Sequence, residues 1–194
     1  MPQENARTGA PREDEGDGGP REDVRGAEYD IFQAVFVVDD NAKFLREVRR
    51  IADEYDTHII FFDADRLAGR DHVTAALRHA RRSWAGGDPI ANSFEMEALL
   101  YAAGTRQCQV AAFFGIHPGE NRAYVVLSPP APGVLERLEE LVTLVDEDWE
   151  EISPEKRERL AELFGITPEE ISVVGEERFR DLVLERVALL DVYR

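Results

Sequence analysis

The sequence predicts a single mixed α/β (α+β) domain in which about seven helices cover a small sheet of three to four strands. Length is the first reason, because 194 residues, 43% of them hydrophobic, supply one sizeable core and are few for two. Periodicity is the second, since short β-branched and aromatic runs alternate with longer segments whose apolar residues recur at helical spacing. The third is a change of composition near residue 28, which separates a tail over residues 1–27 from a domain over residues 28–194.

The tail over residues 1–27 is polar. It is rich in glycine, proline, acidic residues and arginine, and it contains one valine but no leucine, isoleucine or aromatic residue. Such a segment buries too little apolar surface to offset the entropy lost on ordering. We therefore expect the tail to be disordered.

The domain opens with strand, helix, strand and helix. Residues 31–38 are β-branched and aromatic and predict a strand, while residues 58–64 predict a second strand that is apolar on both faces and therefore central. Residues 71–84 predict a helix that ends at a glycine pair. Between the two strands, residues 42–54 predict a helix whose inward side comprises Phe44, Leu45, Val48 and Ile51.

The next helix is predicted to begin after Asn92 or Ser93, because a short side-chain oxygen accepts a hydrogen bond from a free N–H of the first turn. Glu95 and Glu97 place negative charge at the positive end of this helix, and Gly104 ends it. Its predicted core-facing stripe consists of Met96, Leu99, Leu100 and Ala103.

The later elements are shorter. Residues 106–114 suit either a short helix or a strand, and residues 123–127 predict a strand. Further helices are predicted over residues 133–145, from the Ser153-Pro154 pair to Gly165, from a capping box at Thr167, and over residues 176–190.

The charge balance is strongly acidic. The formal net charge is −17, and only Lys43 and Lys156 are lysines, so the other 21 basic residues are arginines. This composition resembles that of proteins from salt-loving archaea, whose charged surfaces stay hydrated in concentrated salt. An acidic protein of an ordinary mesophile is the alternative.

The chain carries no recognisable signal for export. Its N-terminus lacks a basic-then-apolar pattern, and its apolar runs are far too short to span a bilayer. Cys108 is the only cysteine, which excludes an intrachain disulfide. We expect a cytoplasmic protein with no membrane partner.

Motifs that would indicate an enzyme are missing from the sequence. It contains no phosphate-binding loop, no dinucleotide-binding glycine pattern and no nucleophile elbow. His72 and His79 are seven residues apart on one predicted helix, roughly 10 Å at 1.5 Å per residue, too far to share one ion. Asp63 and Asp65 follow a strand, where an α/β enzyme would use them as acid and base, although turn capping explains them better. The sequence therefore predicts no catalytic residue, metal, cofactor or small-molecule substrate.

Basic residues gather in one part of the acidic chain. Five arginines and a single acidic residue lie between positions 66 and 82. A confined cationic zone of this kind is typical of a surface that contacts phosphates, and the alternative is that the arginines pair with neighbouring carboxylates. The five arginines are Arg66, Arg70, Arg78, Arg81 and Arg82.

Four segments, taken in order, carry a family resemblance. They are residues 61–69 (FFDADRLAG), 90–107 (IANSFEMEALLYAAGTRQ), 114–116 (FGI) and 182–192 (LVLERVALLDV). Together they resemble the archaeal Cgi-type subunit of the KEOPS complex, whose animal counterpart is the kinase-binding protein TPRKB. The resemblance extends from about residue 29 to the C-terminus and omits the tail. Residues 106–115 depart from it by being shorter and more apolar.

The resemblance implies a non-catalytic binding protein. A subunit of this family docks on the small kinase-like ATPase of KEOPS and so joins the synthase of N6-threonylcarbamoyladenosine in tRNA. It also holds the unpaired 3′ CCA end of the tRNA, which offers bases for stacking and for edge hydrogen bonds. A free-standing RNA-binding protein is the alternative reading.

Candidate contact residues follow from this reading. Arginine binds phosphate with two parallel hydrogen bonds, and amide side chains read base edges. For tRNA the candidates are Arg66, Arg70, Arg78, Asn92, Arg106 and Gln107. For the kinase subunit, the candidate is an apolar patch near Ile90, Phe94 and the last helix.

Overall fold

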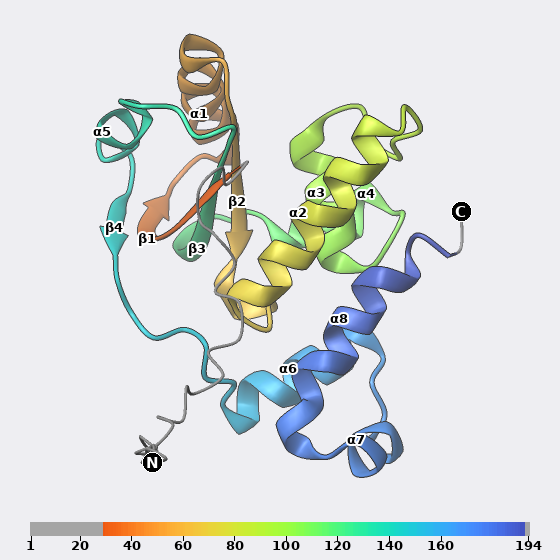
Figure 1. The fold of residues 1–194 in the computed structure, drawn as a ribbon. Coiled ribbons are helices and arrows are strands. Elements are labelled where there is room, and N and C mark those ends of the chain that lie inside the picture. Colours follow the sequence, from red (N-terminus) through yellow and green to blue (C-terminus); the bar gives the residue numbers. More distant parts are fainter. Residues whose placement is uncertain (1–28, 193–194) are drawn as a thin grey trace, which may run out of the picture.

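The computed structural model describes residues 29–192, so the predicted tail over residues 1–27 lies outside the described part (Figure 1). One antiparallel sheet has its strands in the order β2-β3-β1-β4. Within it, Val126 of β3 stands opposite Ile31 on one side and Ile60 on the other. The strands are β1 (Asp30–Val38), β2 (His58–Asp63), β3 (Gly119–Ser128) and β4 (Thr143–Val145).

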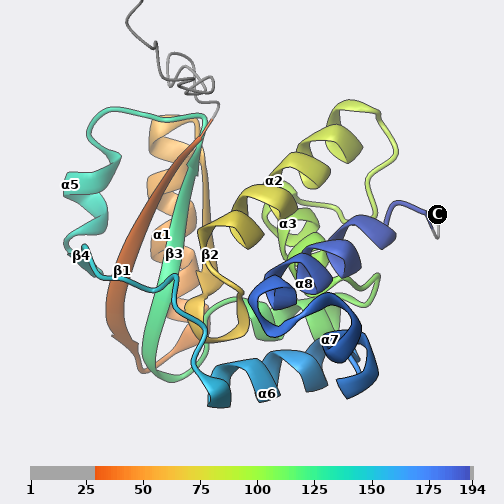
Figure 2. The same ribbon diagram turned by 60° about the horizontal axis from the view of Figure 1, so that its bottom comes forward.

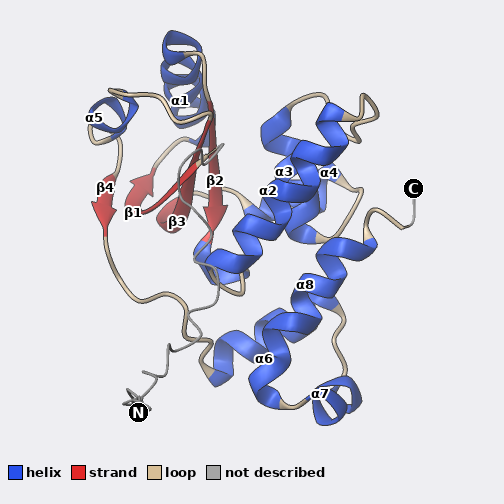
Figure 3. Ribbon diagram, viewed as in Figure 1, coloured by secondary structure: helices blue, strands red, loops and turns tan. Residues whose placement is uncertain are grey.

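Eight α-helices and three 3₁₀ turns lie within residues 29–192 (Figure 3), which confirms the predicted mixed α/β class and a single domain. None of the helices in this part of the chain has the length and apolar character needed to cross a membrane. The α-helices are α1 (Asn41–Tyr55), α2 (Arg70–Ala85), α3 (Phe94–Ala103), α4 (Cys108–Ala111), α5 (Val134–Leu138), α6 (Pro154–Phe164), α7 (Pro168–Val174) and α8 (Phe179–Leu189). The 3₁₀ turns are η1 (Ala64–Arg66), η2 (Ala112–Phe114) and η3 (Glu176–Arg178).

Two hydrophobic cores lie on opposite faces of the sheet. On one face, α1 and α5 pack over Phe61 and Val125, with Ile51 among their buried residues. On the other face, α2, α3 and α8 gather over Phe62 and Tyr124, and Figure 2 shows these helices together on the side away from α5. The sheet is therefore covered on both faces by helices.

Helix α3 runs through the larger core. Of its two candidate caps, Ser93 accepts the hydrogen bond, from the backbone N–H of Met96 at 3.2 Å, and Gly104 ends the helix with a φ of 59°. The buried surface is broader than the predicted stripe, because Tyr101 is fully buried while Met96 and Leu99 are half-buried. Helix α3 is therefore a central helix of the fold.

Several predicted helix signals are confirmed. Ser153 caps α6 by accepting a hydrogen bond from the N–H of Lys156, and Thr167 forms the predicted capping box with Glu170. Within the ambiguous stretch over residues 106–114, residues 108–114 are helical, as α4 and η2.

Strand β2 is an edge strand, so the prediction of a central strand is wrong. Within residues 29–192 it pairs with β3 alone. Both of its faces are buried because a helical layer covers each face, with Ile59 in one core and Ile60 in the other. The prediction for Leu45 is also wrong, since this α1 residue is 51% exposed beside the open edge of β2.

The prediction of one helix over residues 133–145 is wrong as well. Helix α5 covers only Val134–Leu138, and Thr143–Val145 forms β4, which pairs with residues 33–35 of β1. The free edge of β1 provides the hydrogen-bond partners that turn this β-branched end of the segment into a strand. The predicted last helix is divided in a similar way into η3 and α8.

Candidate functional site

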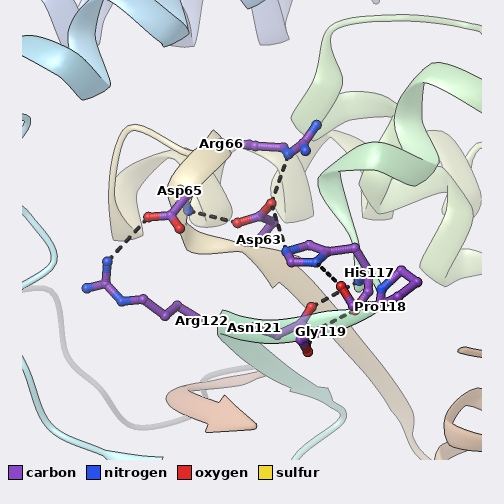
Figure 4. Close-up of polar contacts among 8 residues, drawn as sticks. All are labelled: Asp63, Asp65, Arg66, His117, Pro118, Gly119, Asn121 and Arg122. Atoms are coloured by element: carbon purple, nitrogen blue, oxygen red, sulfur yellow. Dashed lines mark hydrogen bonds and ion pairs between the residues drawn. The ribbon is translucent and has the colours of Figure 1, made fainter. Parts of the chain in front are cut away.

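Polar side chains gather where β2 ends and β3 begins (Figure 4). Asp63, the last residue of β2, accepts a hydrogen bond at Oδ1 from the N–H of Asp65 and another at Oδ2 from Nε of Arg66, both at 2.9 Å. The carboxylate thereby caps η1, as the turn-capping interpretation predicts. Both carboxylate oxygens of Asp63 are thus engaged in holding the turn and the Arg66 side chain.

The environment of Asp63 alters its acidity. Burial raises the pKa of this carboxyl, and the hydrogen bonds from Asp65 and Arg66 oppose the rise. His117 brings its Nε2 to 4.0 Å from Oδ2 of Asp63. A carboxylate that is only 6% exposed therefore lies between an arginine and a histidine.

The turn that carries His117 is held by a buried amide. Asn121, which is 4% exposed, donates from Nδ2 to the carbonyls of His117 and Gly119, and accepts at Oδ1 from the N–H of His117. Three hydrogen bonds of 2.8–3.0 Å fix the backbone on both sides of Pro118. The position of His117 beside Asp63 is therefore set by the backbone of this turn (Figure 4).

An exposed aromatic ring lies beside Arg66. Phe113 of η2 is 63% exposed, and the guanidinium carbon of Arg66 lies 5.8 Å from the centre of its ring. Arg106 and Gln107, both exposed, stand in the turn immediately before α4 and η2. Of the predicted tRNA contacts, Arg66 thus lies beside Phe113, which sequence reasoning did not assign to the site, and Arg106 and Gln107 precede the short helical segment that carries Phe113.

The other predicted tRNA contacts lie elsewhere. Arg70 donates from Nη2 to the carbonyl of Ile31 on β1 at 3.0 Å, so its side chain is directed away from Phe113. Arg78 is exposed eight residues further along α2, and Asn92 precedes the opposite end of α3 from Arg106. The cationic zone of the sequence therefore does not form one continuous surface.

Two of the remaining zone arginines have partners of their own. Arg82 forms an ion pair with Asp191, and Arg81 donates to the hydroxyl of Ser128 at 3.4 Å. The alternative interpretation of the cationic zone, that its arginines pair with neighbouring groups, therefore holds for Arg81 and Arg82.

The predicted kinase contacts are largely internal. Phe94 is only 5% exposed, and its ring packs against His58 and Trp84 with centres 5.0 Å and 6.0 Å apart. Ile90 is half-buried, and its N–H donates to the carboxylate of Glu97. Trp84, which is 37% exposed, therefore presents more apolar surface here than either predicted contact.

Two histidines of α2 serve in packing. His72 is fully buried, accepts at Nδ1 from the N–H of Ala68 and donates from Nε2 to the carbonyl of Ala102. His79 contacts the carboxylate of Asp191 at 2.7 Å. Over residues 29–192, no group of three His, Cys, Asp or Glu side chains is arranged to hold a metal ion.

A large groove follows the open edge of β2. Its volume is about 1150 Å³, with α1 on one side and α3, α4 and η2 on the other. Residues 58–61 of β2 form its floor, and Arg66, Phe113 and His117 line one end. The polar cluster around Asp63 therefore borders the groove through Arg66 and His117.

In comparisons with known proteins, neither a protein-family model nor a curated protein matches this chain.

Proposed function

We propose that this protein is a non-catalytic subunit of a KEOPS-type complex, which binds the kinase-like ATPase subunit and recruits tRNA by its 3′ CCA end for N6-threonylcarbamoyladenosine modification. The observation that carries the proposal is that the four segments of the family resemblance fold into one unit. The hydroxyl of Tyr101, in the second segment, donates to Asp191, in the fourth, at 2.6 Å. A hydrogen bond thus joins two of the four segments although they lie far apart in the sequence.

Close packing at two glycines supports the same view. A Cβ on Gly104 of the second segment would lie 3.2 Å from the carbonyl oxygen of Arg186 in the fourth. A Cβ on Gly115 of the third segment would lie 3.4 Å from a methyl group of Leu99 in the second segment and 3.8 Å from the carbonyl oxygen of Phe61 in the first segment. The segments that carry the family resemblance therefore contact one another, as we expect if this chain shares the fold of that family.

The RNA-binding part of the proposal rests on Phe113 and Arg66. An exposed ring offers a stacking surface to an unpaired base, and an adjacent guanidinium adds a contact to base or phosphate. Such contacts persist better in strong salt than attraction by net charge, which falls steeply with ionic strength. Of the predicted residues, Arg66, Arg106 and Gln107 therefore remain the main candidates.

A gel shift in high salt tests RNA binding. We expect intact tRNA to bind more tightly than tRNA without its CCA end, and Phe113→Ala to weaken binding of the intact form by about tenfold, since stacking is worth ~1–3 kcal/mol per base. Phe113→Tyr should restore binding because it keeps the ring. Val173→Ala, at an 86% exposed position on α7, is the matched control.

A paired substitution separates local contact from overall charge. Arg66→Ala combined with Arg106→Ala should weaken the complex with intact tRNA. Arg46→Ala combined with Arg159→Ala removes the same charge from exposed positions on α1 and α6 and should have little effect. Equal losses for the two pairs would mean that the site residues are wrongly chosen.

Pull-down with the archaeal KEOPS kinase subunit in high salt tests the other half of the proposal. We expect a stable complex that is weakened by Trp84→Ala, because Trp84 supplies exposed apolar surface next to Ile90 and Phe94. A lack of kinase binding alongside tRNA binding would favour the free-standing RNA-binding protein. Failure to bind either partner would remove the proposal.

A further inference from the structure

The floor of the groove is the edge of β2 that faces away from β3, where Ile59 and Phe61 are 4% and 5% exposed. Within residues 29–192, the backbone of β2 makes ladder hydrogen bonds to β3 only. The carbonyl oxygen of Phe61 faces Gly115, on the side away from β3. Because an antiparallel ladder alternates, the N–H and C=O groups of Ile59 and Phe61 belong to this open edge.

Both walls of the groove carry apolar side chains. Leu45 and Val48 line it from α1, and Met96 and Leu99 line it from α3, with Phe113 beyond them. Leu45 and Phe113 are 51% and 63% exposed. Apolar side chains at the rim and unpaired backbone groups on the floor are the two features that an added β-strand requires.

Shape argues against the β2 edge of a second copy of this chain as the partner strand. The β2 edge of another copy would be flanked by its own α1 and α3, which would collide with the walls of the first. The tail over residues 1–27 is also unsuited, because it has almost no apolar side chains to place against the walls. A single extended segment of another protein meets both requirements.

Charge specifies one end of the segment. Where β2 begins, Asp53 and Asp56 line the groove beside Arg49 of α1, while Glu95 of α3 lies 2.6 Å from Nδ1 of His58 and already has a partner there. This end favours a basic residue in the bound segment.

We propose that the groove binds an extended peptide of a protein partner, which adds a strand to the β2 edge. Its successive apolar side chains face α1 and α3 in turn, and it carries a basic residue at the Asp53 end. The groove shares Arg66 and Phe113 with the tRNA contacts proposed above, but peptide binding is inferred from the β2 edge and the two walls and does not rest on tRNA or kinase binding.

Selection from a displayed library of random peptides of about ten residues tests the inference, with the full-length protein as bait in high salt. We expect enriched peptides to contain a run of consecutive apolar residues, since successive side chains of the added strand face α1 and α3 in turn, and to include a lysine or arginine near one end. Absence of enrichment, or enrichment of sequences with helical periodicity, would overturn the proposal.

N-methylation then tests backbone pairing directly. In an enriched peptide, methylating the alternate amides that face β2 should weaken binding by at least about tenfold, whereas methylating the other alternate set should leave it nearly unchanged. Hydrogen exchange at the amides of Ile59 and Phe61 should slow when the unmodified peptide binds. Equal effects of the two methylation patterns would contradict strand addition.

A variant of the exposed rim completes the test without disturbing the core. Leu45→Glu should weaken peptide binding by about tenfold, and Val173→Glu, on the exposed surface of α7, should not. The free energy of unfolding of each variant, measured by urea titration, provides an independent check that the protein is intact. Loss of peptide binding in both variants would argue for a non-specific apolar interaction.

Discussion

Glu97 is a buried carboxylate that holds a connection onto α3. It is fully buried, and its oxygens accept hydrogen bonds from the hydroxyl of Ser83 at 2.6 Å and from the N–H groups of Ile90 and Ala91 at 2.9 and 2.7 Å. A buried charge is tolerated only with such partners. Glu97 therefore does more than complement the helix dipole, because it satisfies the backbone of the segment that leads into α3.

Replacing Glu97 should destabilise the protein markedly. Glu97→Ala leaves two backbone N–H groups without their acceptor and removes the 2.6 Å hydrogen bond of the Ser83 hydroxyl, and we expect a loss of about 3 kcal/mol in the free energy of unfolding. Urea titration at a fixed high salt concentration measures it. Glu158→Ala, at an exposed position on α6, should change stability by no more than about 0.5 kcal/mol. Similar small losses in both variants would refute a structural role for Glu97.

His72 links stability to pH. Burial lowers its pKa from 6.5 to about 4, which the hydrogen bond to Ala102 only partly opposes. The unfolded chain therefore binds a proton at this residue near pH 6.5, whereas the folded protein does so only near pH 4. Folded His72 stays neutral across that interval.

The free energy of unfolding should fall as the pH is lowered from 6.5 to 4, by about 3 kcal/mol from this residue alone. The contribution is complete above pH 6.5 and is lost progressively as the pH approaches 4. His72→Gln removes the titrating group, so its stability should decline less over this interval. Parallel stability curves for the two proteins, measured by urea titration, would contradict the assignment.

At the scale of the elements, α3 and α8 lie close together at Gly104. Gly104 and Gly165 both end helices with a φ of 59°, so an added Cβ costs each a similar backbone strain. They differ in surroundings, because nothing lies within 4 Å of a Cβ on Gly165, whereas the carbonyl oxygen of Arg186 lies 3.2 Å from one on Gly104.

This pair isolates the energy of helix packing. Gly165→Ala should cost about 1 kcal/mol of stability, from backbone strain alone. Gly104→Ala should cost about 1–3 kcal/mol more, because a backbone carbonyl must move to admit the methyl group. Thermal or urea unfolding of the two variants measures the difference. Equal costs would mean that α8 adjusts its position freely against α3.

The elements also indicate what the sequence could predict. Helix signals are local, so the caps at Ser93, Ser153 and Thr167 were predictable. The place of β2 in the sheet was not, since apolar residues on both faces report burial between two layers and carry no information about neighbouring strands. Strand β4 depends on the free edge of β1, a long-range partner that periodicity does not reveal.

The candidate site was predictable only in part. Arg66 lies beside Phe113, and Arg106 and Gln107 precede the segment that carries that ring. Arg70 is held against Ile31, and because each helical residue turns by 100°, Arg78 points about 80° away from it around α2. Phe113 has one signal in the sequence, because adjacent Phe113 and Phe114 in a short helical turn cannot both face inward. The structure buries Phe114 and exposes Phe113.

At the scale of the whole molecule, electrostatic repulsion opposes folding. The net charge is −17, and many ion pairs are exposed, such as that between Arg178 and Asp181, whose side chains are 63% and 57% exposed. Exposed pairs contribute between zero and about 1 kcal/mol each, and salt screens them too. Salt therefore weakens both the large repulsion between acidic groups, which opposes folding, and the small attractions within the exposed ion pairs, which favour it.

Stability should consequently rise with salt. Screening shortens the Debye length from about 10 Å at 0.1 M to about 3 Å at 1 M, so the free energy of unfolding should increase over this range and level off above it. Urea titrations at several KCl concentrations measure the increase, and the same series in NaCl separates screening from a specific effect of potassium, since screening predicts matching curves. Stability that falls on adding salt would mean that the ion pairs outweigh the repulsion, and the acidic surface would then need a reason other than a salt-rich environment.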